Sequence, residues 1–245
     1  MGGTISNAVE ALLVARKTGM LIDGLPSGSE PQSIAEAYAI QDEVSKVLSP
    51  IIGWKVAPSR SGPEVLTGPL YQETFIAESS LSIAGLKNPY LECEIAFRVG
   101  HQITSNTPES ELLDKLQVVP LFEISHTRFT DVFKVPPLSL LADSYAAGFI
   151  KVGSPVDCWR DLPAVRQQFR ITVDGKLIEE FNYADKLKAA LELAIAVVRN
   201  KDGRSRSLPL GTVITTGSIS KPSILSGEVV ADYGPLGVNR LMLHA

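Results

Sequence analysis

The chain has few of the residues on which many protein sites depend. Its 245 residues include only 2 cysteines and 3 histidines. Two cysteines are too few for a disulfide framework, and they are not spaced as zinc ligands. The histidines form no close-spaced ligand motif such as H-E-x-x-H. We therefore expect neither a disulfide scaffold nor a histidine-based zinc enzyme.

An excess of positive charge and a long apolar run are also missing. The 23 Lys and Arg residues are outnumbered by 27 Asp and Glu residues, which gives a formal net charge of −4. Nucleic-acid binding normally requires a basic patch or stripe, so we expect none. The N-terminal apolar run 11–15 is too short to span a membrane or to form a signal core. We therefore expect a cytoplasmic protein without a membrane partner.

The common phosphate-binding and nucleophile motifs do not occur. There is no G-x-x-x-x-G-K-[ST] or G-x-G-x-x-G sequence to cradle a phosphate, and no G-x-S-x-G nucleophile elbow. The sequence thus gives no support for nucleotide chemistry or for an α/β-hydrolase serine.

The composition and periodicity are those of a globular α+β protein. Hydrophobic residues make up 44% and charged residues 20% of the chain. Apolar spacing predicts helices over 5–18, from about 34 to 48, from 107 to 116 and from 182 to about 199. Strands are predicted at 51–57, 81–86, 91–97, 118–125 and 149–152 and in a hairpin around Asp174-Gly175. Most of the chain that follows the last predicted helix is also expected to form strands. Turn residues predict loops over 58–69 and around Pro136-Pro137.

Two carboxylates two residues apart interrupt the apolar run 91–97. Side chains alternate across a strand, so Glu92 and Glu94 leave one face together while Leu91, Cys93 and Ile95 leave the other. One interpretation is an amphipathic strand with a solvated polar face. The other is a pair of ligands for a hard divalent cation, which prefers converging oxygen donors.

A third carboxylate, Glu123, lies in the apolar run 118–125. Pro120 in the same run predicts a sheet edge or the first residues of a strand. A buried anion without a partner costs several kcal/mol or takes up a proton. Glu92, Glu94 and Glu123 together therefore predict an all-oxygen site for Mg²⁺, Mn²⁺ or Ca²⁺.

Two further polar residues occur in apolar contexts. Lys55 lies in the middle of the strand 51–57, where it is either an ordinary half-exposed lysine or a functional cation. Gln41 lies on the apolar face of the second helix, where it is either a core glutamine bonded to backbone or a site-lining group.

Taken in order along the chain, several segments resemble the 2-keto-4-pentenoate hydratases. These, with the related 4-oxalocrotonate decarboxylases, belong to the fumarylacetoacetate hydrolase superfamily. The matching segments are Gly53-Trp54-Lys55-Val56, Gly68-Pro69-Leu70, the run 91–97, the run 122–128, Ala142-Asp143, Asp174-Gly175 and Thr216-Gly217.

The resemblance implies an α+β fold in which an N-terminal helical α/β portion, residues 1–80, packs on a mixed β-roll, residues 81–245, that binds the metal. The two portions are expected to form one integrated unit. Mg²⁺ or Mn²⁺ would be held by Glu92, Glu94 and Glu123. A homo-oligomer is implied, and so is association of hydratase with decarboxylase.

The implied activity is that of a lyase. Hydration of a 2-hydroxy-2,4-dienoate from aromatic meta-cleavage is the first expectation, decarboxylation of a 4-oxalocrotonate-type acid is the second, and C–C hydrolysis of an acylpyruvate is the third. Lys55 matches a lysine near the substrate and is a predicted catalytic residue. The predicted substrate-binding residues are Gln41, Asp143, Ser144, Thr216 and Gly217.

The chain departs from the hydratase pattern at several positions. Leu66 stands where an acidic residue is usual, and Ala146 and Ala147 stand where serines are usual. His126 replaces an aspartate, and an ordinary pKa near ~6.5 would suit it to general acid/base catalysis. Its alternative role is that of a surface or capping histidine. These departures also allow a catalytically reduced partner subunit of a hydratase/decarboxylase complex.

Overall fold

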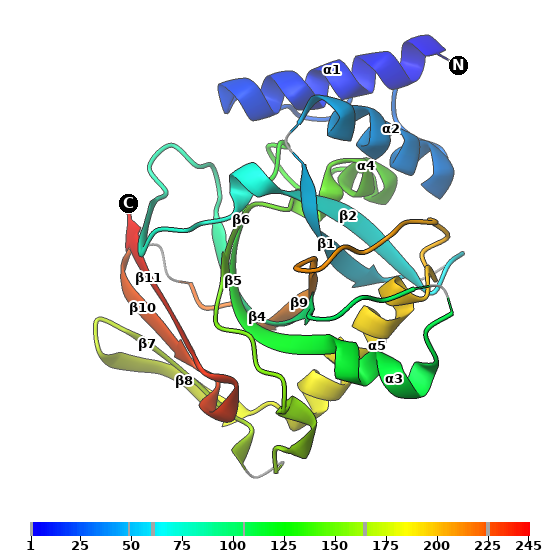
Figure 1. Cartoon of the computed structure of the whole chain (residues 1–245). Coiled ribbons are helices and arrows are strands. Elements are labelled where there is room, and N and C mark those ends of the chain that lie inside the picture. Colours follow the sequence, from blue (N-terminus) through cyan, green and yellow to red (C-terminus); the bar gives the residue numbers. More distant parts are fainter. Residues whose placement is uncertain (1, 49, 60–61, 105, 164–165, 224–225) are drawn as a thin grey trace.

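The computed structural model describes the whole chain except residues 1, 49, 60–61, 105, 164–165 and 224–225 (Figure 1). The α-helices are α1 (Gly2–Thr18), α2 (Ile34–Val47), α3 (Glu109–Lys115), α4 (Pro137–Ala142) and α5 (Ala184–Val198). The strands are β1 (Ile51–Pro58), β2 (Val65–Tyr71), β3 (Ser80–Ser82), β4 (Tyr90–Val99), β5 (Leu116–Ser125), β6 (Phe149–Val152), β7 (Gln168–Val173), β8 (Lys176–Asn182), β9 (Val213–Ser220), β10 (Gly227–Asp232) and β11 (Val238–His244).

The strands form two mixed sheets. The first has six strands in the order β2-β1-β9-β4-β5-β6, and the second has five in the order β3-β11-β10-β7-β8. Only β1 with β9 and β11 with β3 pair in parallel among the described ladders. The first sheet curls strongly, whereas α1, α2 and α4 gather at the end of the molecule opposite the β7–β8 hairpin (Figure 1). The predicted α+β class is confirmed.

Local signals in the sequence place several element ends correctly. Helix α1 ends before Gly19, whose φ of 70° suits a glycine stop. Ser33 Oγ accepts a hydrogen bond from the backbone N–H of Glu36 at 3.2 Å, so it caps α2. Asp174 and Gly175 have φ values of 47° and 77°, as the tight turn of the β7–β8 hairpin requires.

Three local predictions are wrong. Residues 65–69, expected in a loop, belong to β2, which tolerates Pro69 because it lies at the sheet edge. Pro137 opens helix α4, where its missing N–H is no loss. Pro120 lies in the interior of β5, which is not an edge strand. The nitrogen of Pro120 points toward the side where β6 pairs, but the paired residues of β5 begin only at Leu121. On that side the Pro120 carbonyl accepts a hydrogen bond from the N–H of Gly153 at 2.8 Å.

Both faces of the six-stranded sheet are apolar away from the glutamates. The larger core lies between the two sheets and includes Cys93, Ile95 and Phe122. The opposite face of the same strands carries Ala96, Leu121 and other buried apolar residues. Because side chains alternate along β4 and β5, Glu92, Glu94 and Glu123 share this second face.

A separate core holds the helices together. Residues of α1 and α2 pack against Phe129, Leu141 and Ala142, which come from the middle of the chain. The strands β1 and β2 of the N-terminal portion hydrogen-bond into the same sheet as β4 and β5. The division near residue 80 stays a prediction. Among the described residues, no helix combines the length and apolar character needed to cross a bilayer.

Candidate metal centre

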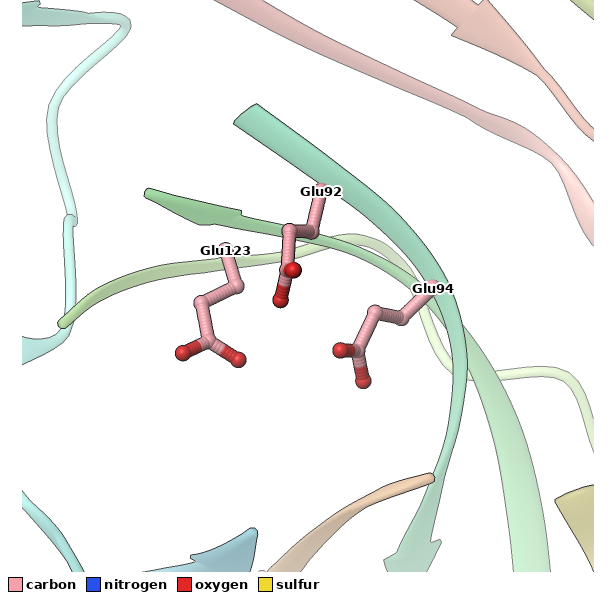
Figure 2. Close-up of side chains that lie close together, drawn as sticks. All are labelled: Glu92, Glu94 and Glu123. Atoms are coloured by element: carbon pink, nitrogen blue, oxygen red, sulfur yellow. The ribbon is translucent and has the colours of Figure 1, made fainter. Parts of the chain in front are cut away.

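The three glutamates meet because of strand register. Glu92 of β4 pairs directly with Glu123 of β5, and Glu94 lies two residues further along the same face of β4. One carboxylate oxygen from each residue lies within 4.8 Å of the others. Figure 2 shows the three side chains converging on one point from the two strands. Like charges placed this close repel one another, so the cluster needs a compensating cation.

Burial excludes the solvated-face interpretation. Glu92 is 7% exposed, and Glu94 and Glu123 are 0% exposed. Glu94 Oε1 and Glu123 Oε2 are buried and, within the described part of the chain, have no hydrogen-bond partner. Buried acceptors of this kind cost free energy unless a ligand satisfies them. Two unpartnered carboxylate oxygens beside a third glutamate fit a divalent cation that takes oxygen ligands.

Two lysines and one backbone amide surround the cluster. Lys55 Nζ of β1 lies 2.6 Å from Glu123 Oε1 and 3.6 Å from Glu92 Oε2. Lys221, which follows β9, contacts Glu92 Oε1 and is largely exposed. The backbone N–H of Gly217 donates to Glu94 Oε2 at 3.2 Å. These groups leave part of the negative charge uncompensated.

The protonation of the cluster reflects its burial. Burial and the charge of Glu123 raise the pKa of Glu94 to about 8, although Lys55 opposes the shift. Burial also raises the pKa of Glu123 against the opposing effect of Lys55. Burial alone would lower the pKa of Lys55, but the charges of Glu123, Glu92 and Glu94 outweigh it and raise that pKa. Lys55 is therefore a protonated ammonium at neutral pH.

Thr216 and Gly217 lie close to the cluster, but their polar groups are engaged in the structure. The Thr216 hydroxyl donates to the Ile95 carbonyl at 2.6 Å, which ties β9 to β4. The Gly217 N–H is the donor to Glu94 described above. A substrate contact by either residue stays a prediction.

Gln41 is buried on helix α2, where this helix meets β2 and α4. Its amide nitrogen donates to the carbonyls of Thr67 at 3.1 Å and Leu141 at 2.6 Å. Its side-chain oxygen accepts from Arg204 at 2.8 Å. Gln41 thereby links α2 to β2, α4 and the segment after α5, which matches the core-glutamine alternative. Its substrate-binding role stays a prediction.

Asp143 is held by two arginines. Its Oδ1 accepts from Arg128 Nε at 2.5 Å and from Arg16 Nη2 at 3.3 Å, and its side chain is fully buried. The adjacent residues Ser144, Tyr145 and Ala146 have φ values of 55°, 54° and 56°. Three successive left-handed residues without a glycine are costly, so the buried Asp143 ion pairs hold a strained segment in place.

His126 follows β5 and is half-buried. Its ring stacks on Phe149, with 6.4 Å between the ring centroids. Burial and the nearby charge of Arg128 lower the pKa of His126 to about 4, although Asp143 opposes the shift. The imidazole is therefore neutral at pH 7 and has no proton to give as an imidazolium acid. A catalytic role as a neutral base or donor stays a prediction.

Sequence reasoning missed Lys221 and Gly148. Lys221 follows β9 in a segment that local patterns give no reason to place near β4. The need for glycine at position 148 is visible only in the folded structure. A Cβ built on Gly148 would lie 2.0 Å from the Ile124 carbonyl oxygen and 2.7 Å from the His126 nitrogen. The missing side chain lets this loop lie against the end of β5.

Replacement of Gly148 by alanine is therefore expected to destabilise the protein by at least about 1–3 kcal/mol, the usual cost of overpacking, because backbone atoms must move. Gly24→Ala is a matched control, since a Cβ there would meet nothing within 4 Å. Chemical denaturation of both variants measures the difference. Equal stability of Gly148→Ala and the wild type would contradict this account of the loop.

Solved structures with the same fold carry metal ions and small organic acids. The 4-oxalocrotonate decarboxylase from Pseudomonas putida G7, complexed with magnesium and adipate, is 18% identical with a TM-score of 0.77, covering 99% of this chain and 98% of that one. Its complex with calcium and acetate is also 18% identical, with a TM-score of 0.76 and the same coverage. A fumarylpyruvate hydrolase from Pseudomonas aeruginosa, in complex with Mn²⁺ and pyruvate, is 12% identical with a TM-score of 0.50, covering 76% of this chain and 80% of that one.

No family model matches the sequence. No curated protein sequence matches it either. The similarity to solved structures thus concerns the fold, and it confirms the fold that the residue pattern predicts.

Proposed function

We propose that this chain, which has the fold of the fumarylacetoacetate hydrolase superfamily, is a divalent-metal-dependent lyase for a small 2-oxo or 2-hydroxydienoic acid. The observation that carries the proposal is the buried cluster of Glu92, Glu94 and Glu123. Two of its oxygens lack a partner among the described residues, and a protonated Lys55 lies beside it. The proposed cofactor is Mg²⁺ or Mn²⁺, held by the three glutamates.

Each residue of the cluster has a distinct part in this proposal. A bound cation would supply a Lewis acid for the carboxylate and the 2-oxygen of the substrate. The three glutamates hold that cation. Apolar residues such as Ala96 and Leu121 lie on the same face of the sheet and exclude water from that side. The Lys55 ammonium is positioned to stabilise negative charge that develops on the substrate oxygen, in a site where burial strengthens the interaction.

Decarboxylation is the activity that the geometry supports best. When CO₂ leaves, the electron pair of the broken C–C bond delocalises toward the 2-oxygen, and only a proton must then be added. Lys55 can stabilise that oxygen, and solvent water can supply the proton. The decarboxylase with the same fold also aligns over 99% of this chain. This order reverses the one expected from the sequence, where hydration comes first.

Hydration stays the second candidate because of the motifs that the sequence shares with hydratases. Addition of water at C4 needs a group that accepts a proton from the water. Among the described candidates, His126 is neutral but only a weak base, because its pKa is lowered to about 4. Asp143 is engaged by two arginines. Leu66 packs against the helical core, and Ala147 is buried on the apolar sheet face. C–C hydrolysis of an acylpyruvate has the same requirement for an activated water.

Two substrates separate the candidate activities. Purified protein with Mg²⁺ or Mn²⁺ is expected to release CO₂ from 4-oxalocrotonate, and chelation of the metal is expected to abolish the release. In parallel, 2-hydroxypenta-2,4-dienoate is followed by its dienol absorbance and by formation of the 4-hydroxy-2-oxo acid. Formation of that product would place hydration first. Turnover that persists without metal would refute the proposal, and no turnover of either substrate would favour a catalytically reduced partner subunit.

The cellular setting in this proposal follows the sequence-based expectations. The partner is a small organic acid, the chain forms a homo-oligomer or joins a hydratase/decarboxylase complex, and the site of action is the cytoplasm in aromatic catabolism. Gel filtration with light scattering, for the chain alone and mixed with a hydratase, measures the assembly directly.

A further inference from the structure

A polar pocket lies at the end of α5, next to a segment that is distant in sequence from the glutamates. The segment 199–206 contains four cations, Arg199, Lys201, Arg204 and Arg206, and a single anion, Asp202. A pocket of about 520 Å³ opens beside this segment. Its polar lining includes Thr104, Arg199, Asn200, Ser205, Arg206 and Ser207. The volume is within the range of pockets that hold small molecules.

Arg206 is fixed in this pocket on two sides. Its guanidinium carbon lies 4.0 Å from the centroid of the Trp54 ring, in a cation–π contact. Its Nη1 donates to Asp202 Oδ2 at 2.6 Å. Asp202 is itself buried and also accepts from the Thr67 hydroxyl at 2.6 Å. The guanidinium therefore has a defined orientation before any ligand arrives.

The remaining edge of the guanidinium has no partner in the described part of the chain. The Arg206 side chain is only 10% exposed. Its Nε and Nη2 are buried and make no hydrogen bond with any described residue. A buried donor left unpaired costs about 1–3 kcal/mol, and the cost is higher for a charged group. Nε–H and Nη2–H point in parallel from one edge, which is the donor pair that binds two oxygens of a carboxylate or phosphate.

Other groups in the pocket add to this receptor. Arg199 is half-buried at the end of α5, and its side chain forms no hydrogen bond or ion pair with any described residue. Asn200 Oδ1 is buried and likewise unpartnered, so the Asn200 amide can turn toward a ligand or accept from one. Arg204 does not compete for the ligand because it is bound to Asp42 and Gln41. The Asp202 charge offsets only one of the two pocket arginines.

We propose that this pocket is a binding site for the oxyanion group of a small molecule, a phosphate or a carboxylate, with Arg199 and Arg206 as the two cations that line it. The site is separate from the metal centre. Trp54 and Lys55 are neighbours on β1, so their side chains lie on opposite faces of the sheet. Arg206 lies on the Trp54 side, and the glutamates lie on the Lys55 side.

Calorimetric titration tests this proposal. Inorganic phosphate and, separately, acetate are titrated into the full chain in Tris chloride with Mg²⁺. Saturable binding of at least one of them is expected, and the tighter of the two identifies the ligand chemistry. The same titrations on Glu94→Gln, without added Mg²⁺, minimise the contribution of the metal centre. Binding at Arg206 is expected to survive in that variant, so the two sites can fail independently.

Arg206→Lys is the diagnostic variant. Lysine keeps a positive charge for the buried Asp202 but has no planar pair of donors, so anion affinity is expected to fall at least tenfold. Arg199→Gln, which alters a half-buried residue and leaves Asp202 paired, is expected to weaken binding at least threefold. Arg240→Gln, on the exposed face of β11, is the matched control and is expected to bind as the wild type does. Circular dichroism checks that each variant is folded.

Two results would overturn the proposal. One is the absence of saturable binding of either ion up to about 20 mM, an affinity too weak for a specific site. The other is an unchanged affinity in both Arg206→Lys and Arg199→Gln, which would locate the bound ion elsewhere on the protein.

Discussion

Replacement of Lys55 by methionine is expected to destabilise the metal-free protein by about 3–5 kcal/mol, because it leaves buried carboxylates without their counterion. Lys55 is 13% exposed at its side chain and lies 2.6 Å from the fully buried Glu123. Methionine keeps most of the side-chain volume, so the loss reports on charge rather than on packing. Equilibrium denaturation in the presence of a chelator measures it.

Addition of Mg²⁺ or Mn²⁺ is expected to restore much of the stability of Lys55→Met, since a cation bound only by the folded state shifts the equilibrium toward it. Turnover with metal is nevertheless expected to fall by about 10²–10³-fold, the usual cost of removing one group that stabilises developing charge. Lys46→Met is a matched control because Lys46 forms only an exposed pair with Glu43. A metal-free Lys55→Met protein as stable as the wild type would contradict the described electrostatics of the cluster.

Replacement of Glu94 by glutamine is expected to weaken metal binding at least tenfold, or ~1.4 kcal/mol. The amide keeps the shape of the side chain and can still accept from the N–H of Gly217. It removes one negative charge from the three that converge at the site. Isothermal titration calorimetry with Mg²⁺ and Mn²⁺ measures the change, and Glu180→Gln on the exposed strand β8 is the control.

The same variant is expected to have the opposite effect on the metal-free protein. Burial beside Glu123 raises the pKa of Glu94 to about 8, so the folded metal-free protein must take up a proton at neutral pH. Glutamine removes this cost and raises the stability of the metal-free state. Lys55→Met and Glu94→Gln thus shift the metal-free stability in opposite directions. Unchanged metal affinity in Glu94→Gln would remove the three glutamates from consideration as the metal site.

A prediction from local sequence succeeds where the chemistry depends on neighbours along one element. Alternation along a strand is enough to place Glu92 and Glu94 on one face, and the Asp174-Gly175 turn follows from the φ values that a tight hairpin needs. Ser33 caps α2 for the same reason, since its partner is three residues away. These features depend on steric and hydrogen-bonding preferences within a few residues.

Prediction fails where neighbours are set by pairing between distant segments. Gly68 and Pro69 argue locally against a strand, yet β2 forms because an edge strand needs no donor on its outer side. The contact between Lys221 and Glu92 joins residues 129 positions apart. Gly148 matters only because the backbone of β5 occupies the space of its missing side chain.

By itself, the sequence determined that the chain is an α+β protein with three glutamates in apolar strands, and it excluded the common phosphate and histidine-zinc motifs. The tertiary structure alone decided that these glutamates meet. The β4–β5 register pairs Glu92 with Glu123, and the β1–β9 pairing brings Lys55 to the same face. The reason is that strand register and sheet order depend on the summed packing of the whole core, which no local stretch of sequence contains.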